Sequence, residues 1–345
     1  MYDALSMIIA RSRTAAPALP AARTVTVRGS AVLSARETTG RSRFDDEELL
    51  ARAAIGRRDA KKMDRFALLA VAAARALLSS LDERDRAACG FVCGNMMAGW
   101  TFTEPQLRAL HTRGAGEVSP YLASAWFPAA PQGQVSIHAG ARGYAKTFAT
   151  DRCAGAQAIG HAWRRIGGGR SRHLLAGGVE APVSPFVEAA LRQSGHRVEL
   201  LSEAAALLLL GDVDDHDGGE GRGSVVVRAH TSFALARATA AGVTQRLAAV
   251  VRRLTPPTPA IVVCSAAPGD AQTALARSII RDLFPDSRPE VLFPAEIHGE
   301  TLGASSAIAA ATAHRLLQTS AAGQAALIFT LGHFGADALW LQHVP

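Results

Sequence analysis

Apolar stretches alternate along the chain with polar and glycine-rich segments, and their spacing predicts alternating strands and helices. Thr24–Val32 alternates β-branched with small residues, which predicts a strand, and the alanine-rich Ala67–Leu78 predicts a helix entered through Asp64. Further on, the pattern predicts strands at Gly90–Gly94 and His173–Gly177 and a helix at Cys153–Ile166, bounded by Gly167–Gly169. This order indicates an α/β fold.

The same alternation starts again near Glu203, which indicates two similar halves. The predicted strands are Ala204–Leu210, Ser224–Val227 and Ile261–Cys264; the helices are Val243–Leu254, Ala271–Leu283 and Thr301–Leu317; a hairpin joins Ala325–Leu331 to Ala338–Leu341. Asp212–Gly223 is polar and rich in Gly and Asp, as connectors are. We divide the chain into an extension (1–23), an N-terminal half (24–203) and a C-terminal half (204–345).

Composition narrows the class of protein. The longest apolar runs, Phe66–Leu78 and Ala204–Leu210, are shorter than the roughly 20 residues that cross a bilayer, so we expect no membrane span. Met1–Arg23 lacks the apolar core and cleavage site of a secretion signal. The 4 cysteines form no paired CxxC pattern, which indicates a reduced cytoplasmic compartment and no metal site.

The net charge of +7 comes mostly from arginines spread along the chain rather than gathered in one stripe. Such a distribution argues against nucleic acid as a ligand and leaves open an acidic protein as a partner.

Several motifs resemble those of ketosynthases, the condensing enzymes of fatty acid and polyketide assembly, which have the thiolase fold. They are GRRDAKKMDRF (56–66), the Gly-rich stretch 140–143, TDRCAGAQAIGHA (150–162), LLAGGVEAP (174–182), GETLGASSA (299–307) and GHFGAD (332–337). The resemblance implies two similar βαβαβαββ-type halves in a layered αβαβα structure. Within the family, GWTFTEPQL (99–107) and SAWFPAAPQGQVSIHAG (124–140) are most similar to the chain length factor, the ketosynthase-like partner subunit of type II polyketide synthases.

A condensing enzyme needs a thiolate at the N-terminus of a helix and two histidines for decarboxylation. Aligned on the family motif, Arg152 stands at the nucleophile position, and a guanidinium that stays protonated does not attack a thioester. Cys153 follows one residue later, about 100° further around the helix, where we expect it to pack into the core.

The histidine positions are also replaced. The CSAAPGDA segment after Ile261–Cys264 is shortened and lacks the first histidine, Glu300 aligns with the second, and Ala295 aligns with the family's lysine. His298 is the one imidazole nearby. It is a fallback candidate for the lost histidine, or a residue of an ordinary turn.

The nucleophile and the last histidine of the family face each other, so Arg152 and Glu300 are candidates for a buried salt bridge. A guanidinium at a helix N-terminus opposes the helix dipole and needs a carboxylate close by, which Glu300 or Asp151 supplies. The alternative is that Arg152 points to solvent or to a partner.

The resemblance implies a role at an interface rather than in chemistry. In chain length factors, bulky side chains seven residues apart gate a tunnel shared with the ketosynthase; the matching positions are Trp100 and Leu107, which would also share one face of any amphipathic helix. Phe334 matches a family gatekeeper. Trp126, Phe127 and Pro128 are expected at the subunit interface.

The implied partners are a cognate ketosynthase, in a heterodimer, and an acidic acyl carrier protein, with no nucleic acid and no membrane. We expect no bound cofactor, since substrates arrive on the phosphopantetheine arm of the carrier protein. Trimmed segments at CSAAPGDA and near 181–195 are typical of compact factors from polyene-forming systems.

Two other functions stay open. The chain is an active β-ketoacyl synthase if Cys153 serves as a displaced nucleophile with His298. It is an acyl-chain binding protein if it works without a ketosynthase partner.

Overall fold

The computed structural model describes residues 23–213, 223–234, 240–254, 256–266, 269, 271–333 and 335–345. Ten strands form one sheet in the order β3-β2-β4-β5-β1-β6-β10-β9-β7-β8. The strands are β1 (Val25–Ser34), β2 (Gly90–Asn95), β3 (Ala145–Ala149), β4 (His173–Glu180), β5 (Ala204–Asp212), β6 (Ser224–Ala234), β7 (Ile261–Ser265), β8 (Glu290–Leu292), β9 (Ala325–Leu331) and β10 (Gly335–Val344).

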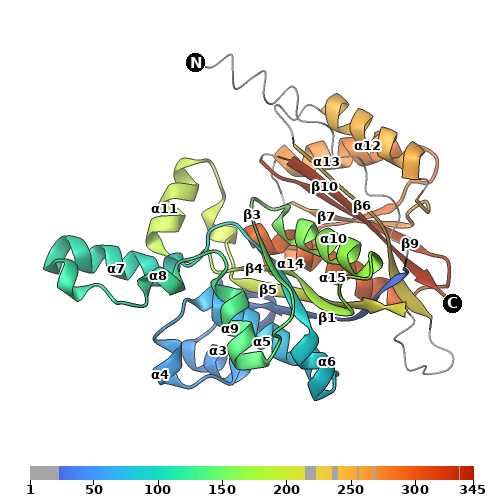
Figure 1. The fold of residues 1–345 in the computed structure, drawn as a ribbon. Helices are drawn as coiled ribbons and strands as arrows, with labels where there is room; N and C mark the ends of the chain where they lie inside the picture. The colour runs from blue at the N-terminus through green and yellow to red at the C-terminus, as the bar shows by residue number, and fades with distance from the viewer. Residues whose placement is uncertain are drawn as a thin grey trace, which may run out of the picture.

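The two ends of this sheet have the same construction (Figure 1). Outward from the centre, the strand order is β1-β5-β4-β2-β3 on one side and β6-β10-β9-β7-β8 on the other. On each side the two outer pairings are parallel and the two inner ones antiparallel. The two sides of the sheet meet where β1 pairs with β6, at Thr26 and Val226. The structure therefore confirms that the chain contains two similar halves.

The repeat falls between β5 and β6, later than the division at residues 203 and 204 that we predicted. The reason is pairing: β5 runs antiparallel to both β4 and β1, so it completes the first half. Residues 214–222 of the predicted connector lie outside the described residues.

Helices cover the sheet in the layers that the resemblance implied (Figure 1). The central layer is α10 (Ala154–Gly167) and α15 (Ser305–Gln318), which contact each other and strands of both halves. Outside the first half lie α3 (Asp46–Ala53), α5 (Arg65–Leu78) and α9 (Ala130–Ala139); outside the second half lie α12 (Ala240–Leu254) and α13 (Ala271–Leu283). The thiolase-like αβαβα arrangement is confirmed.

Burial on β5 shows why the sequence favours this layering. Leu207 and Leu209 pack in the core under α5, whereas Leu208 and Leu210 pack in the core around α10 and α15. Because successive side chains of a strand point to opposite faces, a continuous leucine run suits a strand with helices on both faces.

The remaining helices are short or project from these layers. They are α2 (Ala35–Thr39), α4 (Arg57–Ala60), α6 (Glu83–Ala88), α7 (Trp100–Arg113), α8 (Leu122–Ala125), α11 (Pro185–Gln193) and α14 (Ala295–His298), with 3-10 turns at Ala115–Glu117, Val198–Leu200 and Leu302–Ala304. Helices α7 and α8 project from the body, and α11 stands beside them (Figure 1). In the described part of the chain no helix is both long and apolar enough to cross a membrane.

Most predicted elements are present, with shifted ends. The helix predicted at Thr301–Leu317 begins only at Ser305, because Leu302–Ala304 forms a 3-10 turn. The predicted hairpin is β9 and β10. Strand β3 was not predicted, since AKTFA is short and mostly exposed.

Candidate functional site

The site lies where the two central helices begin. Gly155, in the first turn of α10, approaches α15 so closely that an added Cβ would lie 2.8 Å from the Cβ of Ala307. Gly94 allows the end of β2 to approach the same turn, since its Cβ would lie 2.4 Å from the carbonyl oxygen of Ala154. These glycines bring the turn before α10 against the loop before α15, the two segments that carry Arg152 and Glu300.

Arg152 and Glu300 form a buried, two-point ion pair. Arg152 Nε donates to Glu300 Oε1 over 3.2 Å and Nη2 donates to Oε2 over 2.5 Å, with side chains 8% and 5% exposed. Arg152 Nη1 also donates to Gln272 Oε1 at the start of α13. The predicted salt bridge is present, and the alternative in which Arg152 points to solvent is wrong.

Glu300 is held by its backbone as well as by its side chain. Its amide donates to Leu200 O over 2.7 Å, and its carbonyl accepts from Ser202 N over 3.0 Å. Its Oε1 also accepts from Leu302 N over 2.8 Å and from Ser305 Oγ over 3.3 Å. Counting the two bonds from Arg152, four donors surround a carboxylate that burial alone would strongly disfavour.

Cys153 is buried and poorly suited to form a thiolate. Its side chain is 1% exposed, and burial, together with the nearby carboxylates of Asp337 and Asp151, raises its pKa well above the ordinary value. The carboxylate of Asp151 forms a local hydrogen bond, since its Oδ1 accepts from Cys153 N over 3.0 Å. A thiol held protonated is a weak nucleophile.

His298 and Ala295 lie on α14, one turn before Glu300. His298 is 2% exposed, its Nδ1 lies 3.4 Å from Glu37 Oε2 on α2, and burial lowers its pKa. Ala295, His298 and Glu300 line a cavity with Cys264 and Ser265, but its room is only about 10 Å³. That is about the volume that one water needs.

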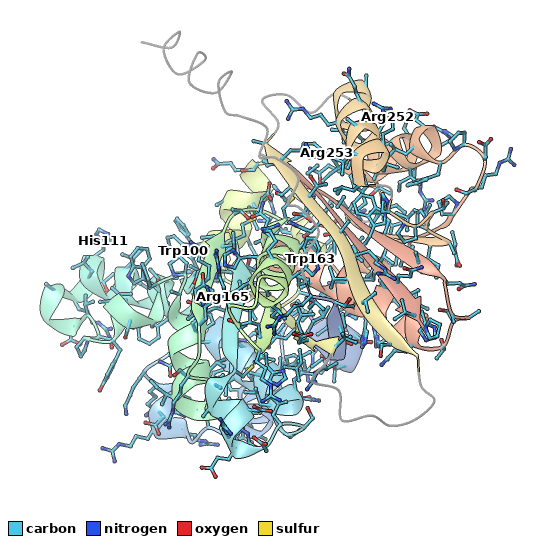
Figure 2. All side chains as sticks on the ribbon, turned by 45° about the vertical axis from the view of Figure 1, so that its right-hand side comes forward. Trp100, His111, Trp163, Arg165, Arg252 and Arg253 are labelled. Atoms are coloured by element: carbon cyan, nitrogen blue, oxygen red, sulfur yellow. The ribbon has the colours of Figure 1, made fainter. Side chains whose placement is uncertain are left out.

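Trp100 and Leu107 both lie on α7, Trp100 at its start and Leu107 near its middle, and both are partly buried. Trp100 is the first residue of the helix, at the base of the projecting arm that α7 and α8 form (Figure 2). Its indole stacks on Phe186 of α11, with ring centroids 4.7 Å apart and planes 20° apart. It also packs against a small core cluster that includes Leu201 and Leu302, the latter two residues after Glu300.

The predicted interface residues lie between α8 and α9. Trp126 and Phe127 are about half exposed, at 48% and 51%, and their rings contact edge to face, whereas Pro128 is partly buried. Pro128 O accepts from Asn95 Nδ2 at the end of β2, over 2.8 Å. Phe334, the predicted gatekeeper, lies outside the described residues.

Glu180 is a site residue that sequence analysis missed. It is fully buried at the end of β4, and its carboxylate accepts from the amides of Met96, Met97 and Gly303 over 2.7, 3.1 and 3.2 Å. Burial raises its pKa to about 8. The signal was a glutamate directly after seven residues of buried strand, where a carboxyl group needs hydrogen-bond partners.

Sequence analysis also missed a second polar network, close to Cys153. His230 Nε2 lies 2.9 Å from Asp337 Oδ2, and Arg164 Nη1 lies 2.9 Å from His230 Nδ1. Because Arg164 can only donate, His230 accepts at Nδ1 and donates from Nε2. Gly160 makes room for the imidazole, since a Cβ there would lie 2.2 Å from Nδ1.

Comparison with known proteins agrees with this architecture. The structure of the ishigamide ketosynthase/chain length factor has a TM-score of 0.79 at 18% identity, covering 94% of this chain and 100% of that one. A type II polyketide acyl carrier protein bound to its ketosynthase, AntDE:AntF, includes a chain with a TM-score of 0.73 at 22% identity, covering 93% of this chain and 100% of that one. At these identities the likeness shows the fold.

Curated relatives match over shorter stretches. The tetracenomycin polyketide synthase ketoacyl synthase beta subunit of Streptomyces glaucescens is 33% identical over 123 residues, which cover 36% of this chain and 29% of the relative. A putative polyketide beta-ketoacyl synthase 2 of Streptomyces cyaneus is 32% identical over 193 residues, covering 52% and 45%. The alignments thus span less than half of these relatives.

The family model for the beta-ketoacyl synthase N-terminal domain matches residues 10–228, well over half of the chain. That segment includes the turn before α10 with Arg152 and all of the first half of the fold, from β1 to β5. The chain belongs to the beta-ketoacyl synthase family.

Proposed function

We propose that the chain is a non-catalytic chain length factor, which pairs with an active ketosynthase and helps set the length of the acyl chain that the pair builds. The observation that carries this proposal is the buried ion pair of Arg152 and Glu300, at the positions where the family places its nucleophile and its last histidine. A guanidinium is not a nucleophile, and both partners are fully engaged with each other and with neighbouring donors and acceptors.

Two further observations favour this function over an active enzyme with Cys153. The pKa of Cys153 is raised by burial and by two carboxylates, which keeps the thiol protonated. His298 faces Glu37, and the cavity that it lines has room for about one water and none for an acyl group.

A direct test uses the purified chain and an acyl thioester. We expect intact-mass spectrometry to show no covalent acyl group, because the chain has no accessible thiolate. Substitution Cys153→Ser should leave the activity of a coexpressed ketosynthase unchanged. Acylation that the Cys153→Ser variant abolishes would contradict the proposal and favour an active synthase.

The chain-length role is proposed for Trp100 and Leu107. Trp100 is anchored on one side by Phe186 and stands at the base of α7, so it can present a rigid wall to a tunnel formed with a partner. A large aromatic side chain blocks the space beyond it, and a smaller one opens it.

Coexpression with the cognate ketosynthase tests this role. Trp100→Ala should shift the products toward longer chains, whereas Trp100→Phe, which keeps most of the bulk, should shift them less. An unchanged product distribution from a Trp100→Ala complex that still forms would show that Trp100 only packs the arm.

The resemblance to ketosynthases and the solved structures similar to this one both support specific partners. We propose a heterodimer with a ketosynthase that has its cysteine and both histidines, and substrates carried by an acyl carrier protein. A ketosynthase/chain length factor and a carrier protein bound to its ketosynthase are among the structures most similar to this one. The basic net charge of +7 favours docking of an acidic carrier.

A further inference from the structure

Strand β3 forms an open edge of the sheet, and its surroundings are positively charged. In the part of the chain that the structure describes, β3 has β2 as its one strand neighbour, and its five residues are exposed or partly exposed. An edge strand of this kind presents unpaired amides and carbonyls to a second chain. Such an edge has to be either protected or matched to a partner.

The charge around this edge is one-sided in the sequence. Between Glu117 and Glu180 the sequence has one acidic residue, Asp151, which is 5% exposed. The same segment supplies α8, α9, β3, α10 and most of β4. Three of its cations have acidic groups close by: Arg152 pairs with Glu300, Arg172 pairs with Asp85, and Arg164 contacts the His230–Asp337 pair. The other Lys and Arg residues of the segment are Arg142, Lys146, Arg165 and Arg170.

Two of these cations sit on a ring cluster that links β3 to α10. Arg165 of α10 (Figure 2) lies over the Tyr144 ring, 3.5 Å from its centroid, and Lys146 Nζ lies 5.9 Å from the centroid of Phe148. His161 connects the two rings: its Nε2 lies 3.0 Å from Tyr144 Oη, and the centroid of its ring lies 5.5 Å from that of Phe148.

The behaviour of His161 reflects this positive surrounding. Its pKa is lowered by partial burial and then by the charges of Arg164, Lys146 and Arg165. The imidazole is therefore neutral at pH 7, and the cluster already repels one additional positive charge. A second set of cations brought to the same edge would meet the same repulsion.

Pairing of β3 with a second copy of this chain would bring two such sets together. Lys146 and Phe148 lie on the face of β3 toward α10, and Thr147 lies on the other face, where its Oγ1 donates to Gln132 of α9. Full antiparallel pairing around a twofold axis centres on Thr147. It makes the two copies of Lys146 diagonal neighbours, roughly 7–8 Å apart, with Arg165 of each chain beside them.

We propose that the positive charge at the β3 edge selects the partner of this chain. It opposes pairing with a second copy and favours a ketosynthase-family chain that carries acidic side chains at the matching positions of its own edge strand. The inference rests on the proposed heterodimer and adds the chemistry that distinguishes the partner from the chain itself. Like charges across an interface suppress the wrong pair, and opposite charges speed up and orient the right one.

A charge-reversed copy of the chain serves as the probe. Sedimentation compares three samples: wild type alone, Lys146→Glu alone and an equal mixture of the two. Each is measured at about 0.1 M and about 1 M salt, because the screening length falls from about 10 Å to about 3 Å between these concentrations. We expect the mixture to associate at least about tenfold more tightly than wild type alone at low salt, because a repulsive pair becomes attractive. The difference should shrink at high salt.

Lys61→Glu is the matched control. Lys61 is exposed at the end of α4, outside β3 and α10, and the substitution makes the same change in net charge. Its mixture with wild type should associate no more tightly than wild type alone. Hydrogen exchange should show protection of the β3 amides in the Lys146→Glu mixture.

Any of three results would overturn the inference: the Lys146→Glu mixture associates no more tightly than wild type alone, the Lys61→Glu mixture tightens association equally, or the amides protected from hydrogen exchange lie outside β3. The assay uses neither an acyl substrate nor a ketosynthase, so its failure is separate from failure of the proposed function. If charge pairing fails while Trp100→Ala still lengthens the product, the chain-length role stands and the partner is selected by other contacts.

Discussion

Removing the charge of Glu300 tests the central ion pair. Glu300→Gln keeps the shape of the side chain but leaves the buried Arg152 guanidinium without its carboxylate. Breaking a buried pair on one side costs about 3–5 kcal/mol, because the remaining charge stays desolvated. We expect the free energy of unfolding to fall by that amount.

The corresponding shift in melting temperature follows from chain length. At about 2.1 cal/mol/K per residue, 345 residues give an unfolding entropy of about 0.7 kcal/mol/K near the transition, so the loss amounts to about 4–7 °C. Calorimetry, or denaturant unfolding where it is reversible, measures it. A double variant, Arg152→Met with Glu300→Leu, should recover most of the stability, because apolar replacements of a buried pair are often neutral or better.

The control is an exposed pair in the same chain. Arg52 and Glu48 form an i,i+4 pair on α3, with side chains 39% and 30% exposed. Glu48→Gln should cost less than about 1 kcal/mol, and salt should weaken the small effect further. If Glu300→Gln costs no more than Glu48→Gln, the argument that the Arg152 pair is buried and tightly coupled is refuted.

Three further predictions concern other buried groups. Burial lowers the pKa of His314, on α15, to about 4, so the folded protein loses stability as the pH falls from about 6.5 toward 4. His314→Gln should remove up to about 3 kcal/mol of that loss, measured by denaturant titrations at each pH. Equal pH slopes for wild type and variant would contradict this prediction. Gly160→Ala should destabilise by several kcal/mol in the same unfolding assay, because its methyl group would meet the His230 ring at 2.2 Å; a change below about 0.5 kcal/mol would mean that the ring moves aside freely. Cys153 should resist iodoacetamide in the native protein and react in denaturant, as read by peptide mass spectrometry; rapid native alkylation at pH 7 would show an accessible thiolate.

Sequence patterns predicted the fold well where long apolar runs are buried. The alanine-rich helix α5 and the leucine-rich strand β5 are buried along almost their whole length, as their continuous apolar runs indicate. The sequence pattern did not predict strand β3, because an exposed edge strand needs no alternation of apolar and polar residues. The end of the first half was misplaced because the pairing of β5 with β4 and β1 depends on contacts distant in sequence.

The site was predictable only in part, for a similar reason. The resemblance implied that Arg152 and Glu300 face each other, which made them candidates for an ion pair. The sequence left open that Arg152 points to solvent or to a partner, and the structure decides for the pair. Gln272 as a third partner depends on how α13 lies against the turn before α10, which no local pattern encodes. The Arg164–His230–Asp337 network joins one helix to two strands, and of its three residues only Asp337 belongs to a motif recognised in the sequence.

The distance along the chain between Arg152 and Glu300 has a kinetic consequence. The two residues are 148 positions apart, so their contact closes a long loop and joins segments from both halves. Closing so long a loop costs chain entropy, so we expect this contact to form late in folding, once each half has its strands in place. We expect Glu300→Gln to hasten unfolding while leaving the refolding rate nearly unchanged. The Arg152–Glu300 pair would then lengthen the lifetime of the folded chain.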